Sequence, residues 1–166
     1  MDFGNWKRLI LNGVLILTIF LAVTAWQGQN LISKQTPAPS FRLPDLSGQL
    51  VELEDLRGRR VLLYFFAPWC KICDLSISNL NWVRKLRGEE SVSIFAVALS
   101  YKELHSVEAF LERNALAVPV LLGTPELLNS YRIRAFPTVY ALNESGDIDG
   151  SSVGYASTIG LWWRTL

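Results

Sequence analysis

The sequence predicts an α/β protein with a central mixed sheet, preceded by one N-terminal transmembrane helix. Three observations support this prediction. Short apolar runs alternate with stretches of helical periodicity, as in parallel strands joined by helical crossovers. Near the C-terminus two strand-like segments flank a tight turn, which adds an antiparallel hairpin to the sheet. An apolar run from Leu9 to Trp26 is close to the roughly 20 residues that a bilayer-spanning helix needs.

Composition limits the classes of protein to consider. The 166 residues include 16 basic and 15 acidic side chains, and neither sign forms a long block. A polyanion-binding surface is therefore not indicated, and nucleic acid is not an expected partner. Beyond the N-terminal segment roughly 135 residues remain, which suits one compact domain. Cys70 and Cys73 are the only cysteines, so the fold depends on its hydrophobic core instead of a disulfide framework.

Residues 9–26 are interpreted as a membrane anchor. Residues 1–8 end in Lys7 and Arg8, which favour a cytoplasmic N-terminus and place the remainder outside the cytoplasmic membrane, in the periplasm or its equivalent. The alternative is a cleaved secretory signal, with Val23-Thr24-Ala25 as its small-residue cleavage site. Residues 27–40 are polar and contain Pro37 and Pro39, so we expect an extended linker before a domain over 41–166.

The domain begins with a predicted hairpin and a buried strand. Residues Phe41 to Leu56 alternate apolar with polar side chains around Ser47-Gly48, which indicates small strands at the sheet edge. Val61 to Phe66 is an unbroken apolar run, typical of a central strand that is buried on both faces. A helix is predicted from Lys71, with one apolar face. That face would comprise Ile72, Leu75, Trp82, Val83 and Leu86.

The remaining elements alternate in the same way. We expect strands over Val92–Leu99, Val118–Leu122, Val139–Leu142 and near Ile148, and helices around Val107 and Phe110, from Thr124-Pro125 to Tyr131, and from Ser157 to Leu166. Trp162 and Trp163 are adjacent, so they cannot both face the core from one helix. One of them is expected to face the membrane interface or a partner, and core packing is the alternative for the other.

The segment Trp69-Cys70-Lys71-Ile72-Cys73 carries the chemistry. Two thiols separated by two residues at the first turn of a helix can close into a disulfide and reopen by thiolate exchange. The helix N-terminus and Lys71 favour a thiolate at Cys70, and Cys73, one turn further, should be more buried and less acidic. The alternatives are an inert disulfide and a metal site. Zinc needs more ligands than this pair and the single histidine, His105, provide, whereas copper(I) on two thiolates stays open.

These features resemble the thioredoxin superfamily, and within it the membrane-anchored TlpA- and ResA-like thiol-disulfide oxidoreductases, over roughly residues 39–155. The matching pieces are Phe41–Gly48, Leu56–Arg59, Phe66–Cys73, Phe136–Thr138 and Gly146–Ile148. The resemblance implies a three-layer α/β/α sandwich. It makes Cys70 the attacking thiol, Cys73 the resolving thiol and Pro137 a cis-proline that faces them, so that the backbone of Phe136 can pair with an extended substrate. Trp69 and Lys71 would support the site.

Two positions depart from the family pattern. Thioredoxins usually carry an acidic residue where this chain has Tyr64, and ResA-like proteins carry Glu where it has Ser76. The remaining candidates for proton transfer at Cys73 are Tyr64 and Asp74. A simpler role for Asp74 is to favour the helix N-terminus electrostatically.

We therefore expect a membrane-tethered thiol-disulfide oxidoreductase that reduces protein disulfides and uses no metal or cofactor. Its partners would be proteins with disulfides or thiols, and a reductase of this kind needs a transmembrane electron donor of the DsbD or CcdA type. Two other functions remain open. A thiol peroxidase of peroxiredoxin type shares the style of opening from Phe41 to Phe66, but normally has Thr shortly before its cysteine. A copper(I)-binding or chaperone module would hold the metal between Cys70 and Cys73 without turnover.

Overall fold

The computed structural model describes residues 3–28, 31–88 and 90–166. The chain divides into two compact units, residues 1–30 and 31–166. The first unit contains α1 (Phe3–Gly28), whose described side chains, those of residues 6–19, 22 and 23, are all exposed. Among the helices whose residues are described, none combines the length and the apolar character required to cross a membrane.

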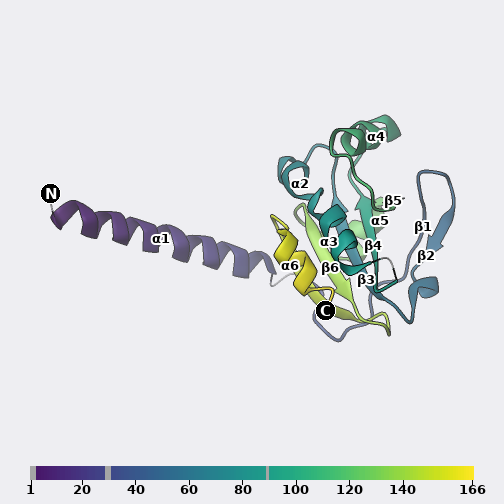
Figure 1. The fold of residues 1–166 in the computed structure, drawn as a ribbon, viewed down its shortest axis with the longest axis horizontal. Helices are drawn as coiled ribbons and strands as arrows, with labels where there is room; N and C mark the ends of the chain where they lie inside the picture. The colour runs from purple at the N-terminus through teal and green to yellow at the C-terminus, as the bar shows by residue number, and fades with distance from the viewer. Residues whose placement is uncertain (1–2, 29–30, 89) are drawn as a thin grey trace. The chain divides into compact units, whose positions relative to one another are not determined.

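The second unit is built on a five-stranded mixed sheet in the order β5-β4-β3-β6-β7 (Figure 1). Its strands are β3 (Arg60–Phe66), β4 (Val92–Ala98), β5 (Val120–Leu122), β6 (Thr138–Leu142) and β7 (Ile148–Val153). The first three are parallel, and β6 and β7 are antiparallel to their neighbours. The mixed sheet predicted from the sequence, with a closing hairpin, is confirmed.

Strand β3 lies at the centre of the sheet and contributes buried side chains to the cores on both of its faces. Leu62, Tyr64 and Phe66 belong to one core cluster. Val61, Leu63 and Phe65 belong to the other, and all of these side chains are buried. Each large apolar side chain removed from water contributes about 1.5–3 kcal/mol, so this one strand supplies a large share of the core. Burial on both faces is what the unbroken apolar run predicts.

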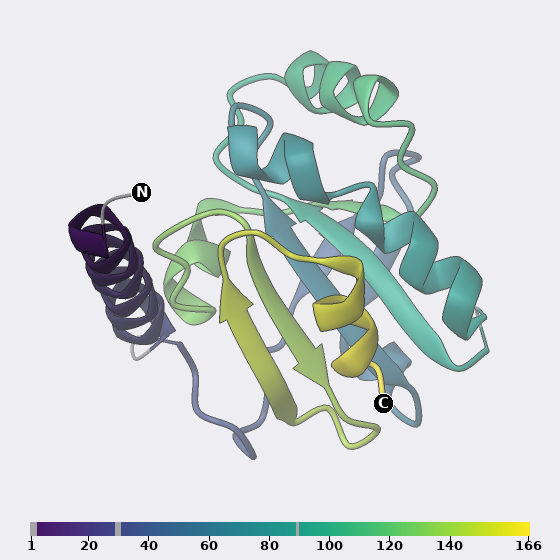
Figure 2. The same cartoon turned by 60° about the vertical axis from the view of Figure 1, so that its left-hand side comes forward.

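Helices cover each face of the sheet, which gives the predicted three layers (Figures 1 and 2). On one face lie α2 (Lys71–Ser76), α3 (Asn79–Arg87), α4 (Leu104–Arg113) and α6 (Thr158–Trp163). The other face is covered by α5 (Pro125–Ser130), the short 3-10 helix η1 (Glu54–Leu56) and the hairpin of β1 (Arg42–Pro44) and β2 (Leu50–Glu52). The Asp45 carboxylate shapes the hairpin turn by accepting hydrogen bonds from the backbone N–H groups of Ser47 (2.8 Å) and Gln49 (2.9 Å).

The single helix predicted from Lys71 is in fact two helices, α2 and α3, separated at residues 77 and 78. The buried positions keep helical spacing across this break but lie on the neighbouring face, so the core receives Cys73, Ser76, Ile77, Leu80 and Val83. The predicted apolar face is therefore wrong except at Val83. Its other members, Ile72, Leu75, Trp82 and Leu86, are exposed.

Residues 31–40 differ from the expected extended linker because they pack against the domain. Leu31 and Ile32 are buried in the second core cluster, and the Ile32 N–H donates to the Tyr140 hydroxyl at 3.2 Å. The Gln35 N–H then donates to the Ile148 carbonyl at 2.7 Å. The domain thus begins ten residues before the predicted boundary at Phe41, because two apolar side chains inside a polar segment supply enough burial to hold it.

Both edges of the sheet are partly covered by other segments. Asp45, at the end of β1, forms an isolated antiparallel bridge with Leu121 of β5. At the opposite edge, Pro37 bridges to Asp147, and the Ile148 N–H donates to the Thr36 carbonyl at 2.9 Å. The pairing of β6 with β7 also shifts register between Ala141 and Leu142, an irregularity that twists an edge strand.

Candidate active site

Cys70 and Cys73 form a disulfide at the end of the central strand. Strand β3 ends at Phe66, and a turn closed by the Cys70 N–H on the Ala67 carbonyl (3.0 Å) brings the chain into α2. Cys70 is the N-cap of α2, and the two Cα atoms are 5.2 Å apart. The predicted position at a helix N-terminus is confirmed.

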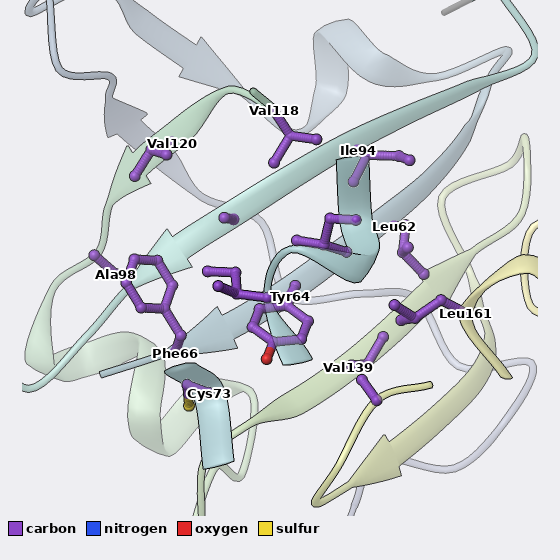
Figure 3. Packing of buried hydrophobic residues seen from close by; sticks show 14 of the residues in the cluster. Leu62, Tyr64, Phe66, Cys73, Ile94, Ala98, Val118, Val120, Val139 and Leu161 are labelled. Atoms are coloured by element: carbon purple, nitrogen blue, oxygen red, sulfur yellow. The ribbon is translucent and has the colours of Figure 1, made fainter. Parts of the chain in front are cut away.

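The two sulfur atoms differ in their access to solvent and in their surroundings. Cys70 is 7% exposed, whereas Cys73 is 0% exposed. The Cys73 backbone N–H donates to Cys70 Sγ at 3.1 Å. Such a donor favours negative charge on that sulfur once the pair is reduced. Figure 3 shows Cys73 within the core cluster that includes Tyr64 and Phe66. Cys70 is therefore the sulfur that an incoming group can reach.

Trp69 and Phe136 come together beside the disulfide from separate parts of the chain. Their rings meet edge to face, with centroids 5.8 Å apart. The Trp69 Nε1–H donates to the Ser100 carbonyl at 2.9 Å, which fixes an indole that is 66% exposed. Lys71 is exposed on the first turn of α2. A firmly held, exposed aromatic ring offers a contact surface for a bound polypeptide.

The Phe136–Pro137 peptide bond is cis, as the resemblance implies. Pro137 is buried, and its carbonyl accepts the Gly154 N–H at 2.9 Å. The next residue, Thr138, pairs with Phe65 near the end of β3. Pro137 therefore lies near the end of β3 from which the cysteine segment starts.

Tyr64 and Ser76 contact each other. Their hydroxyl oxygens are 2.8 Å apart, and the Ser76 hydroxyl also lies 2.9 Å from the Ile72 carbonyl. Burial raises the pKa of Tyr64 well above its ordinary value of 10.0, although the hydrogen bond with Ser76 opposes this. Two neutral hydroxyls thus occupy the positions where the family pattern places acids. Ser76 is absent from the predicted site residues, although the sequence marks it as the position where ResA-like proteins carry Glu.

Asp74 is engaged by residues at the C-terminal end of helix α4. Its Oδ1 accepts a hydrogen bond from Asn114 Nδ2 at 2.6 Å and lies 3.5 Å from Arg113 Nη2. The sequence gives no indication of this pairing, because 40 residues separate Asp74 from Asn114.

Ser100, whose carbonyl holds Trp69, is also absent from the predicted site residues, but its position in the sequence could have indicated it. It follows β4, and the carboxyl ends of parallel neighbours lie at one edge of a sheet, where sites commonly form.

This arrangement is suited to disulfide exchange. A thiolate at Cys70 can attack a disulfide sulfur of another molecule. The buried Cys73 can then attack Cys70 Sγ, because the observed disulfide shows that the two sulfurs meet.

Comparison with known families shows that residues 35–151 match the AhpC/TSA family. The chain is 30% identical over 149 residues to the thiol-disulfide oxidoreductase ResA of Geobacillus kaustophilus, covering 86% of this chain and 85% of that protein. It is 32% identical over 141 residues to ResA of Bacillus subtilis, covering 84% and 77% of the two chains.

Solved structures with the same fold include relatives of this kind. The structure of StoA from Bacillus subtilis superposes with a TM-score of 0.68 at 26% identity, covering 78% of this chain and 98% of that one. A thiol:disulfide interchange protein from Chlorobium tepidum superposes with a TM-score of 0.70 at 26% identity, covering 81% and 96%.

Proposed function

Because the chain belongs to the AhpC/TSA family and is a thiol-disulfide oxidoreductase of the ResA and StoA type, we propose that it reduces protein disulfides outside the cytoplasm while α1 tethers it to the cytoplasmic membrane. The observation that carries this proposal is the asymmetry of the pair. Cys70 is slightly exposed and accepts a backbone N–H, whereas Cys73 is fully buried. One sulfur is thereby suited to attack and the other to resolution.

The reaction takes two exchanges. The Cys70 thiolate attacks one sulfur of a substrate disulfide, so the Cys70–substrate bond forms and the other substrate sulfur leaves as a thiolate. Cys73, after losing its proton, attacks Cys70 Sγ. The internal disulfide forms, the mixed disulfide breaks, and the second substrate sulfur leaves. The substrate gains two electrons, and the pair becomes oxidised to the form seen in the structure.

The proposed reducing direction is supported by the apolar surroundings of Cys73. A dithiol becomes a strong oxidant when its thiolate is strongly stabilised, as the reduced form is then the preferred one. Here Cys70 Sγ accepts the Cys73 N–H, and Cys73 lies among apolar side chains and the neutral hydroxyl of Tyr64. Burial among apolar groups disfavours a thiolate at Cys73, so charge stabilisation of the reduced form is confined to Cys70. Renewal of the dithiol then requires an electron donor, for which we propose a transmembrane protein of the DsbD or CcdA type.

The tether is supported by the apolar side chains of α1 and by the cations that precede them. Its side chains from Val14 to Ile19 are exposed and apolar except for Thr18, and Lys7 and Arg8 precede them. Cations at this end favour a cytoplasmic N-terminus.

Trapping of mixed disulfides tests the proposed reaction. A Cys73→Ala variant expressed in cells should accumulate substrates covalently bound to Cys70, and a Cys70→Ala variant, as the matched control, should accumulate none. The wild-type pair should be mostly reduced when its free thiols are alkylated directly in cells. A pair that rests mostly oxidised would contradict the reducing direction, even if substrates are trapped.

The tether is tested separately by extraction. Membranes washed with high salt and then with carbonate should retain the chain at its intact mass. Release into the wash, or retention at a mass that lacks the N-terminal segment, would overturn the anchor.

A further inference from the structure

We propose that the patch formed by Lys34, Ile159, Trp163 and Arg164, called here the tether-side patch, rests on the anionic lipid headgroups of the membrane that holds α1. This inference builds on the tether in the proposed function. The four residues line a single hollow of about 540 Å³ between β7 and α6, so they form one continuous surface.

The patch exposes large apolar side chains that the fold leaves uncovered. Trp163 is 70% exposed and Ile159 is 79% exposed, both on α6. Trp162, by contrast, packs against the core cluster, so the expectation that the two neighbours face different surroundings is met. Tryptophan favours the interface between lipid and water, where its ring contacts the acyl boundary and its N–H remains hydrated.

The chain itself brings this patch to the bilayer. Only two residues separate Gly28, the end of α1, from Leu31, the first residue of the folded domain. Because Leu31 and Ile32 are buried and Gln35 is bonded to Ile148, the segment from Leu31 onward has no slack to extend the tether. Lys34, within this fixed segment, belongs to the patch.

The charges of the patch match an anionic surface. Lys34 and Arg164 are cationic, and basic side chains beside apolar ones are attracted to a bilayer surface that carries anionic lipids. The Arg164 side chain is oriented by donation from Nη1 to the Gly160 carbonyl at 2.6 Å. Asp149 also lines the hollow, but it forms an ion pair with Arg60 at 3.0 Å, which offsets its charge.

Contact at this patch orients the active site away from the lipid. Gln35 bonds to Ile148, which pairs with Leu142, and Leu142 in turn pairs with Val61 at the start of β3. Cys70 follows the opposite end of that strand, beyond Phe66. The strand between these ends has a length of roughly 20 Å at about 3.3 Å per residue. The cysteine pair is thereby presented to proteins in the aqueous space.

The test is fluorescence quenching in vesicles that contain phosphatidylglycerol and lipids brominated on the upper acyl chain. The full chain is reconstituted in a background with Trp6→Phe and Trp26→Phe, which removes the indoles of residues 3–28. Brominated lipid should quench part of the emission, and Trp163→Phe should abolish that part. Trp69→Phe is the matched control, since Trp69 is similarly exposed but adjoins Cys70, and it should leave the quenched emission unchanged.

Charge is tested in the same vesicles. Replacing phosphatidylglycerol with phosphatidylcholine should reduce the quenching of Trp163, and Lys34→Glu should remove this dependence on lipid charge. Retention after a carbonate wash is recorded for every sample.

The outcomes separate the patch from the tether. A chain that is retained but shows no Trp163-dependent quenching overturns the patch and leaves the tether standing. A chain that is not retained overturns the tether and the patch with it. Quenching that follows the protein-to-lipid ratio instead of the bromine content would indicate a second copy on the patch and would also overturn the inference.

Discussion

At the scale of single residues, the cysteine pair is defined by what surrounds Cys73. Tyr64 and Ser76 form a hydroxyl pair in the core, and burial raises the pKa of Tyr64 above its ordinary value. Tyr64 therefore remains protonated at every pH at which the enzyme is expected to work. A hydroxyl pair of this kind can pass a proton along but does not titrate near neutral pH.

This distinction predicts different outcomes for the two candidate proton-transfer residues. Asp74→Asn should leave the pH dependence of disulfide exchange unchanged, because the carboxylate is engaged by Asn114 and Arg113. Tyr64→Phe should slow the formation of the Cys70–Cys73 disulfide by about tenfold, which is less than the usual rate contribution of a general acid or base. The pH at which the closure rate is half-maximal should not change. Stopped-flow measurement of closure from about pH 5 to about pH 9, below the ordinary tyrosine pKa, provides the check.

Ser76→Ala is the matched control for that experiment, since it removes the other hydroxyl of the pair and should slow closure in the same way. A shifted midpoint in Asp74→Asn would show that Asp74 takes part in the proton transfer. An unchanged closure rate in Tyr64→Phe would remove Tyr64 from the mechanism.

At the scale of elements, the sequence predicts the strands better than the helix that carries the site. The run that became β3 is apolar throughout and that of β4 nearly so, and a short apolar run in an alternating pattern has few other interpretations. The break between α2 and α3 has no proline or glycine to mark it. Ile72, Leu75 and Leu86 keep helical spacing and yet are exposed, so periodicity alone selects the wrong face.

Among the site residues, those in short sequence motifs could be predicted, and those defined by contacts between elements could not. Cys70, Trp69 and Pro137 lie in short motifs that the sequence displays directly. The contacts of Ser76 with Tyr64, and of Asp74 with Asn114, join residues that only the folded chain brings together. Sequence reasoning could not find these pairs because their partners lie on other elements.

The turn after β5 gives a prediction at this scale. A Cβ on Gly123 would lie 2.5 Å from Leu99 Cδ2 and 2.9 Å from the Ala98 carbonyl oxygen. The Gly123 N–H is bonded to that same carbonyl at 2.9 Å, so the backbone cannot move away without losing the bond. Gly123→Ala should therefore lower the free energy of unfolding by about 1–3 kcal/mol, the usual cost of overpacking.

Gly150→Ala is the control for Gly123→Ala, since the nearest atoms to its Cβ lie at ordinary contact distances of 3.9 and 4.0 Å. Its effect should stay within about 0.5 kcal/mol. Urea unfolding of the full chain in mild detergent, with the disulfide intact, measures both variants. Equal stability of the two variants would contradict the close packing at Gly123.

At the scale of the whole molecule, the sequence predicts the layer order and the mixed sheet but not where the domain begins. Leu31 and Ile32 stand in a segment rich in polar residues and followed by Pro37 and Pro39, a composition typical of linkers. Their burial depends on a site formed by distant parts of the chain, including Tyr140, to which the Ile32 N–H donates. Local composition carries no information about such a site.

The early start of the domain can be measured. Ile32→Ala should reduce the free energy of unfolding by about 2–4 kcal/mol, because it removes a buried side chain and leaves a cavity. Lys34→Ala, two residues further in the same segment but exposed, should change it by less than about 0.5 kcal/mol. If residues 31–40 were a free linker, both variants would unfold at the same urea concentration.

The covered sheet edges bear on how this protein avoids aggregation. An uncovered edge strand is exposed to strand addition, the contact from which fibrils and domain-swapped oligomers grow. In this fold the hairpin residue Asp45 pairs with Leu121 at one edge, and Thr36 pairs with Ile148 at the other. The segment that joins α1 to the domain thus also covers this edge of the sheet, so that cleavage within it would open the edge to self-association.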